Sequence, residues 1–172
     1  QEKAIEKIDS RFERESIKNL WNYLGQDVFL RNSANQIARL TENLLQHNLD
    51  EAPFVEVIDL HSPLPGEGAT QIHIYDKDKE ALFGRTVECL SQLQLSIVDA
   101  SINTNENGIC FDTYTVLDLE GQPIDKSVTH REEIKDRLIQ QLTAQKPNIS
   151  QGHFTNRRIA RQLREFKTKT KV

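Results

Sequence analysis

The sequence has no methionine and only two cysteines, and it lacks any long run of apolar residues. No stretch approaches the ~20 apolar residues that span a bilayer, and no signal peptide opens the chain. The hydrophobic share of 37% is low and the charged share of 28% is ordinary, which is typical of a soluble protein with much exposed helix. We therefore expect a cytoplasmic protein without membrane contact.

The two cysteines, Cys89 and Cys110, are 110 − 89 = 21 residues apart, which matches no metal or redox motif. We expect both to be core thiols in a reducing compartment.

Motifs for catalysis are also missing. The sequence has no glycine-rich phosphate loop, no nucleophile elbow and no paired-histidine metal motif. Its histidines are scattered, and no two stand at ligand spacing; they are His47, His61, His73, His130 and His153. Asp76 and Asp78 form a tight carboxylate pair, and they enter a predicted helix whose dipole they stabilise. We predict no catalytic residue and no metal site in this chain.

The ends of the sequence indicate a piece of a longer protein. There is no initiator methionine, a helical pattern is already running at Gln1, and an alternating pattern is still running at Val172.

The centre of the chain, residues 71–117, has the periodicity of a small α+β unit. Ile72 and Ile74 alternate as in a strand, and Leu82 and Leu90 belong to one apolar helical stripe over 81–93. Strands are predicted over 95–104 and 108–117, a helix over 129–144, and a last strand near 166–172. The order βαββαβ predicts a ferredoxin-like antiparallel sheet with two helices on one face.

Other elements are predicted before this unit. A helix is expected over 2–24, ending at Gly25, and a second one from a capping box formed by Ser33 and Gln36. Residues 54–60 alternate as an extra strand beside the sheet. We divide the chain into a helical linker over 1–52, following an absent catalytic domain, and a sheet domain over 53–172 with an irregular insertion at about 146–160.

Charge is distributed unevenly. Residues 71–118 carry three basic and eight acidic side chains, a net of −5, and residues 157–171 carry seven basic and one acidic, a net of +6. An RNA-recognition module is an alternative for βαββαβ, and Gly108 to Tyr114 partly matches its aromatic strand motif. The match lacks the leading basic residue and includes Asp112, so we expect no nucleic-acid partner and a basic tail that is solvated or docked within the chain.

Three segments resemble the ACT domain, a βαββαβ regulatory module that binds amino acids and pairs with another copy of itself. The corner from Asp78 to Gly84 is similar to that family's Asp-Arg-Pro-Gly-Leu-Leu-Ala corner, and residues 96–104 and 111–118 are similar to its second and third strands. The resemblance implies an ACT–ACT pair, and these ligand-binding residues: Asp78, Glu80, Ala81, Leu82, Ser96 and Ile97.

Residues 21–31, 36–38 and 161–164 further resemble a family of bifunctional enzymes that add UMP to the P-II nitrogen signal protein and remove it. In that family they lie between the hydrolytic HD domain and the chain end. The resemblance implies a regulatory role that helps relay glutamine status, catalytic sites that use Mg²⁺ outside this chain, and a second ACT domain beyond Val172. This chain itself would then hold no cofactor and no enzyme activity. A structural copy without a ligand is the alternative within this family.

Two residues of the corner depart from the family pattern. Ala81 stands at the family's glycine and Glu80 at its proline. A Cβ hinders close approach and restricts positive φ, and a carboxylate at a helix N-terminus competes with a ligand carboxylate. We therefore expect glutamine, the implied ligand, to bind this copy weakly or not at all.

Overall fold

The computed structural model describes residues 1–61, 68–124 and 128–144. Four helices come first and are followed by a sheet domain. In chain order the elements are α1 (Glu2–Ile5), α2 (Arg14–Tyr23), α3 (Gln26–Arg31), α4 (Ala34–Gln46), β1 (Phe54–His61), β2 (Gly68–Lys77), α5 (Leu82–Gln92), β3 (Ser96–Thr104), β4 (Ile109–Leu117) and α6 (Val128–Thr143).

The four strands form one antiparallel sheet in the order β1-β2-β4-β3. The α+β class is confirmed, and so is the extra strand: β1 pairs with β2 along its whole length. Both sides of β2 are therefore occupied, by β1 and by β4. The predicted last strand near residues 166–172 and the basic tail lie outside the described residues.

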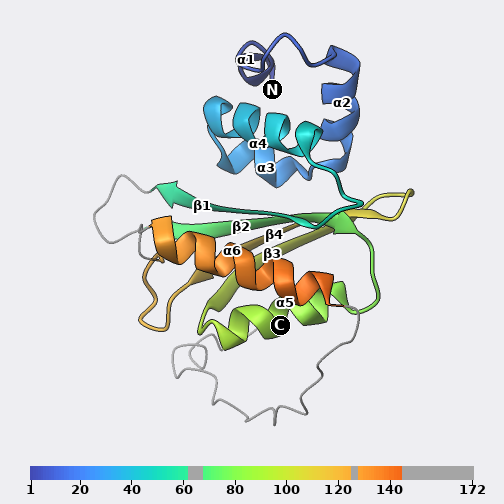
Figure 1. The fold of residues 1–172 in the computed structure, drawn as a ribbon. Helices are drawn as coiled ribbons and strands as arrows, with labels where there is room; N and C mark the ends of the chain where they lie inside the picture. Colours follow the sequence, from blue (N-terminus) through green and yellow to red (C-terminus); the bar gives the residue numbers. More distant parts are fainter. Residues whose placement is uncertain (62–67, 125–127, 145–172) are drawn as a thin grey trace, which may run out of the picture.

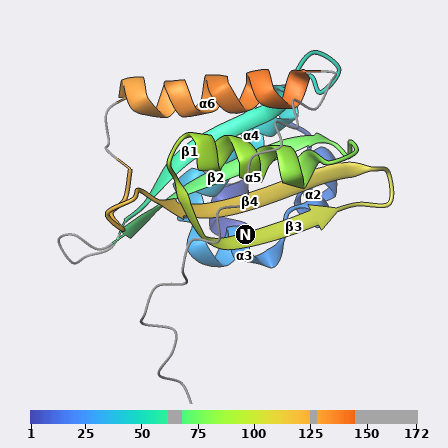
Figure 2. The ribbon, with the colours of Figure 1, turned by 90° about the horizontal axis from the view of Figure 1, so that it is seen from below.

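Helices α5 and α6 cover one face of the sheet, as the βαββαβ pattern predicts (Figure 2). The apolar stripes of the two helices pack against the strand side chains that point to this face of the sheet. Cys110, Tyr114 and Val116 are all buried on this face of β4. They form one core with Val55, Ile72, Ile74, Leu82, Cys89, Leu90, Leu95, Ile124, Ile134, Leu138 and Leu142.

The opposite face of the sheet is covered by the helical N-terminal part of the chain, with α3 and α4 next to the sheet and α1 beyond α4 (Figure 1). The sequence predicted helices in this part of the chain but not their packing on the sheet. Phe111 of β4 is 1% exposed and belongs to a second core built mainly by these helices. Phe54 and Tyr75 pack against the same core. Within it the Trp21 indole donates to the Thr41 hydroxyl at 2.8 Å. We call residues 1–46 the helical lead-in.

Ion pairs fasten the lead-in at two edges of the sheet. Arg31 of α3 contacts Asp99 of β3 at 2.8 Å, and Arg39 of α4 contacts Glu56 of β1 at 3.0 Å. The first pair is half exposed and adds little stability, because water screens it. The pair therefore determines the position of α3 on the sheet and contributes little to the strength of that packing.

The start of the chain differs from the single helix predicted over 2–24. The structure has two helices there, because the chain turns between them. At this turn the Arg11 backbone amide donates a hydrogen bond to the Asp9 carboxylate at 3.0 Å. Gly25 is the N-cap of α3, a helix that the sequence analysis missed. The capping box of Ser33 and Gln36 at the start of α4 is confirmed. None of the helices in the described part of the chain is long and apolar enough to cross a bilayer.

If lead-in and sheet share a core, truncating Phe111 will destabilise both. We expect Phe111→Ala to lower the free energy of unfolding by about 3–5 kcal/mol, since it leaves a cavity between the two parts. The half-exposed Phe83 gives a matched control, and Phe83→Ala should cost about 1 kcal/mol or less. Chemical denaturation followed by tryptophan fluorescence, which reports Trp21, measures both. A Trp21 transition unmoved by Phe111→Ala would show that the lead-in folds separately.

Candidate functional site

The corner between β2 and α5, residues 78–81, holds most of the predicted ligand residues. Its backbone is fixed against the β3–β4 turn, because the Asp78 amide donates to the Gly108 carbonyl at 2.7 Å. Asp76, at the end of β2, is fully buried and paired with Lys79 at 2.9 Å. The corner is therefore a rigid connection.

Ala81 lies in the left-handed region, at φ 60° and ψ 21°, and is the N-cap of α5. This conformation is one that glycine adopts freely and that costs an L-residue roughly 1–2 kcal/mol. The family's glycine thus aligns with a position where the backbone requires positive φ. Ala81 adopts this conformation at a cost, so the restriction that its Cβ places on positive φ does not prevent it.

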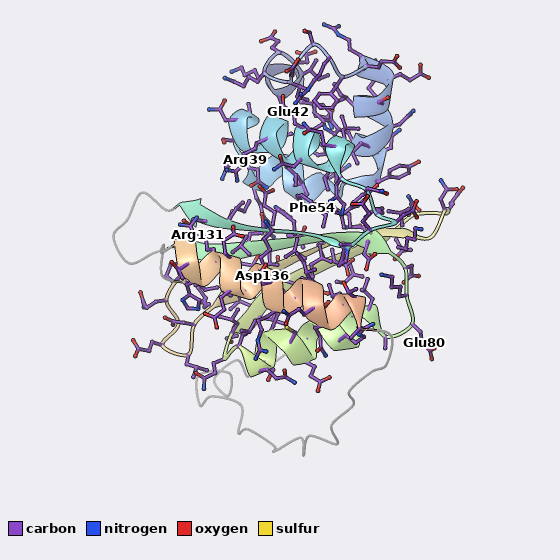
Figure 3. The ribbon with its side chains drawn as sticks, in the orientation of Figure 1. Arg39, Glu42, Phe54, Glu80, Arg131 and Asp136 are labelled. Carbon is purple, nitrogen blue, oxygen red and sulfur yellow. The ribbon has the colours of Figure 1, made fainter. Side chains whose placement is uncertain are left out.

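The first turn of α5 offers free backbone donors. No side chain caps it, and the turn contains no acidic residue. Leu82 donates its amide to the Lys79 carbonyl, whereas the amides of Phe83 and Gly84 have no protein acceptor within the described residues. Glu80 is exposed and points away from the sheet at the corner (Figure 3). Its predicted competition with an anion at this turn stays a prediction.

The structure brings Asp78, Glu80, Ala81 and Leu82 together but leaves two predicted residues elsewhere. Ser96 and Ile97 begin β3, opposite the end of β4 at Leu117, whereas the corner adjoins the beginning of β4. Eight residues of β4 separate these positions (117 − 109 = 8), roughly 27 Å along a strand. Ser96 instead lines a separate hollow of about 330 Å³ with Gln94 and Asp118.

Asp112 belongs to the same end of the sheet as the corner, and the sequence analysis did not assign it to the site. It is 1% exposed and shares the α5 face of β4 with Cys110 and Tyr114. The Tyr114 hydroxyl lies 3.5 Å from its Oδ2, while its Oδ1 has no hydrogen-bond partner among the described residues. A signal was available, because Asp112 interrupts the apolar alternation of Cys110, Tyr114 and Val116.

Burial raises the pKa of Asp112 to about 6, because the carboxylate loses its hydration in this position. The charge of Asp78 raises this pKa further, while hydrogen bonds from the Asn103 backbone amide and the Tyr114 hydroxyl lower it. A buried carboxylate with a raised pKa and an unpaired oxygen is a recurrent mark of a functional position.

Another buried polar group, His73, lies on the opposite face of the sheet, between the sheet and the lead-in. His73 is fully buried, stacks on Phe111 at 5.4 Å between ring centroids, and contacts the Thr113 hydroxyl through Nδ1 at 3.1 Å. Burial lowers its pKa to about 4, so the ring is neutral near pH 7. Asn32 of the lead-in reaches the Gln71 amide oxygen beside it at 3.4 Å. The interface is thus partly polar.

The structure does not favour the RNA-binding alternative. An RNA-recognition sheet stacks bases on exposed aromatic residues of its open face. Here that face carries Phe111, which the lead-in buries, and Tyr114 is fully buried beneath α5 on the other side.

Among the described residues, no group of three or more histidine, cysteine, aspartate or glutamate side chains is arranged to hold a metal ion. The Mg²⁺ implied by the resemblance concerns catalytic sites outside this chain, and it stays an expectation.

Comparison with known proteins gives similarity to one family. Residues 1–43 match the family model described as "Uridylyltransferase GlnD fifth domain". The chain is 40% identical over 151 residues to a bifunctional uridylyltransferase/uridylyl-removing enzyme of Ectopseudomonas mendocina, covering 87% of this chain and 16% of that protein. It is 38% identical over 161 residues to the protein of that name from Azotobacter vinelandii, covering 92% and 17%. It is 37% identical over 154 residues to the protein of that name from Pseudomonas putida, an alignment that covers 88% of this chain and 16% of that protein.

The chain therefore spans about a sixth of the length of the curated relatives that it matches. No solved structure matches it.

The strain at Ala81 can be measured directly. We expect Ala81→Gly to raise the free energy of unfolding by about 0.5–1 kcal/mol, because relief of the left-handed penalty exceeds the entropy cost of a glycine. Gln94, also at φ 60°, should respond in the same direction when changed to glycine. Ala34 has no positive φ, so Ala34→Gly should cost up to about 1 kcal/mol. Denaturant titration would contradict the account if Ala81→Gly and Ala34→Gly destabilised equally.

Asp112 should make stability depend on pH. Its pKa in the folded state, about 6, lies above the ordinary value of 3.8, so the folded state binds the proton more tightly than the unfolded state does. The free energy of unfolding therefore decreases as the pH rises from about 4 to about 6 and above. We expect Asp112→Asn to raise the free energy of unfolding by about 1–3 kcal/mol at pH 7.5 and by little at pH 4. The exposed Asp136 supplies the control Asp136→Asn, which should show no such difference. An equal effect of Asp112→Asn at both pH values would count against a buried charge.

Proposed function

Because the chain belongs to the family of bifunctional uridylyltransferase/uridylyl-removing enzymes, of which it represents one segment, we propose that it is a regulatory part of such an enzyme. In this role the sheet domain is an ACT module, and it helps to relay glutamine status to nucleotidyltransferase and hydrolase sites elsewhere in the protein. The P-II signal protein is then the substrate, acted on in the cytoplasm, with Mg²⁺ at the catalytic sites.

The packing of the lead-in on the sheet is the observation that carries this proposal. Residues 1–43 match a family model of their own, yet they share a core with Phe111, Phe54 and Tyr75 of the sheet domain. A conformational change in the sheet can therefore be transmitted to the preceding helices through the packed side chains of this core and the Arg31–Asp99 ion pair.

Pairing with a second ACT copy fits the outer edge of the sheet. The last strand on that side, β3, exposes Val98 and Ile102 at 54% and 45%, and Phe83 of α5 is 51% exposed. Exposed apolar residues on an edge strand favour strand-to-strand association. In an antiparallel pair of β3 strands centred near Ala100, Ser96 of one copy lies beside the partner's Thr104, close to the partner's corner. The two separated halves of the predicted ligand set would meet there.

A charge reversal at the interface tests the relay. In the full-length enzyme that carries this chain, we expect Arg31→Asp to shift the glutamine concentration needed for half-maximal control of P-II uridylylation by about fivefold, since the repulsion costs about 1 kcal/mol. The double variant Arg31→Asp/Asp99→Arg should restore the original value. Arg11→Asp reverses a lead-in arginine paired only within the lead-in and should change nothing.

Uridylylation and its removal are assayed on the same preparations. A response to glutamine that is identical in the Arg31→Asp variant and the parent enzyme would contradict the relay, as would UMP transfer to P-II by the isolated chain.

A further inference from the structure

We propose that the outer edge of β1 is a docking site for an extended acidic segment of a partner protein, which adds a strand to the sheet beside β1. This edge lies on the far side of the sheet from β3, and the proposed function does not use it. The segment is held by main-chain hydrogen bonds to β1 and recognised by cationic side chains on both sides of that strand.

A groove of about 300 Å³ lies at this edge, between the lead-in and α6. Arg39 and Asn43 of α4 form one wall, residues 54–57 of β1 form the floor, and Arg131 and Lys135 of α6 belong to the other wall. Arg39 and Arg131 lie on opposite sides of β1 (Figure 3). Figure 2 shows α6 alongside β1, at the opposite side of the sheet from β3. The groove therefore follows the edge strand between two helices.

β1 has the regular geometry that strand addition requires. All of its residues pair with β2 in one continuous register, and the strand contains no lysine and no proline. Edge strands are commonly protected from further pairing by such residues or by bulges. The other edge strand, β3, has an irregular register between Ile97 and Asp99. Because β1 ends the sheet in the described part of the chain, the outward half of its backbone amides and carbonyls is presented to an added strand.

The acidic side chains of β1 are already neutralised. Glu56 contacts Arg39 at 3.0 Å, and Asp59 contacts Arg131 at 3.3 Å. Only 13% of each of these two acidic side chains is exposed, whereas Arg39 is 60% exposed and Arg131 is 28% exposed. The two pairs therefore turn positive charge towards solvent.

Lys135 adds to this positive charge. Its side chain is 40% exposed. Burial raises the pKa of Glu56, and the charges of Arg39 and Lys135 oppose that rise, so both cations lie near the edge of β1. Glu132, at 3.6 Å from Lys135, is the acidic residue of the groove whose side chain is largely exposed. Three cations and one exposed acid thus border the groove, which favours an acidic occupant over a neutral or basic one.

The two walls also determine the spacing of the acidic residues in the occupant. Side chains of an added strand alternate between the two faces of the sheet. Arg39 lies on the lead-in face, and Lys135 lies on the α6 face. An occupant with acidic residues at two consecutive positions therefore directs one carboxylate to each wall. A second copy of β1 does not meet this requirement, because its own acids are already paired with arginines of the same chain.

Fluorescence polarisation with a labelled peptide tests the site. The probe is fluorescein-labelled Thr-Val-Thr-Asp-Glu-Thr-Val-Thr amide, and we expect it to bind the chain with a dissociation constant below about 100 μM. The matched peptide with Asn-Gln in place of Asp-Glu should bind at least about tenfold more weakly. A version of the probe with methylated backbone nitrogens keeps both carboxylates but cannot donate main-chain hydrogen bonds, and it should not bind.

Charge reversal locates the binding on the chain. Lys135→Glu should weaken the acidic probe at least about tenfold and strengthen a peptide that carries Lys-Lys in place of Asp-Glu, which shows that the variant is folded. Lys18→Glu reverses an exposed lysine of α2 outside the groove and should leave the affinity for the probe unchanged.

Three results would overturn the proposal. They are equal affinity for the acidic and neutral peptides, undiminished binding of the methylated probe, and no saturation at about 1 mM of the chain. Sedimentation velocity of the chain alone adds a fourth: self-association that the acidic probe abolishes would assign the edge of β1 to a second copy instead.

Discussion

The burial of β4 on both faces is the constraint on which the rest of the structure depends. Phe111 fills the core beneath the lead-in, and Tyr114 fills the core beneath α5 and α6, so one strand belongs to both cores. Because β4 lies between β2 and β3, the lead-in cannot leave the sheet without uncovering Phe111. The same burial makes every polar side chain on β4 expensive unless it has a partner.

Two energetically unfavourable features lie near the same end of this strand. Ala81 holds a left-handed conformation at the start of α5, and the buried Asp112, on the α5 face of β4, has one carboxylate oxygen without a hydrogen-bond partner among the described residues. Each costs stability, and neither is needed to close the fold, because glycine and a neutral residue would serve better. Costly local features persist at positions where function requires them. Their coincidence at the corner makes it the centre of the proposed sensor.

The sequence predicted those elements whose signals are local. Alternation at Ile72 and Ile74 indicated β2, and the reciprocal contacts of Ser33 and Gln36 marked the start of α4. Docking of the lead-in was not predictable, since it depends on which face of the sheet Phe111 occupies and on contacts between distant residues such as Arg31 and Asp99. The separation of Ser96 from the corner follows from the antiparallel register of β3 and β4, in which Ser96 pairs with Leu117. Asp112 was missed although it interrupts the apolar alternation of β4, because the sequence does not show how deeply this carboxylate is buried.

The central claim is that ligand binding at the corner changes the packing of the lead-in on the sheet. Hydrogen–deuterium exchange of the full-length protein, with and without saturating glutamine, tests it most directly. The account predicts a change in the exchange of backbone amides in α3 and α4 as well as in the first turn of α5. Changes confined to the corner, with exchange in α3 and α4 unaltered, would contradict it.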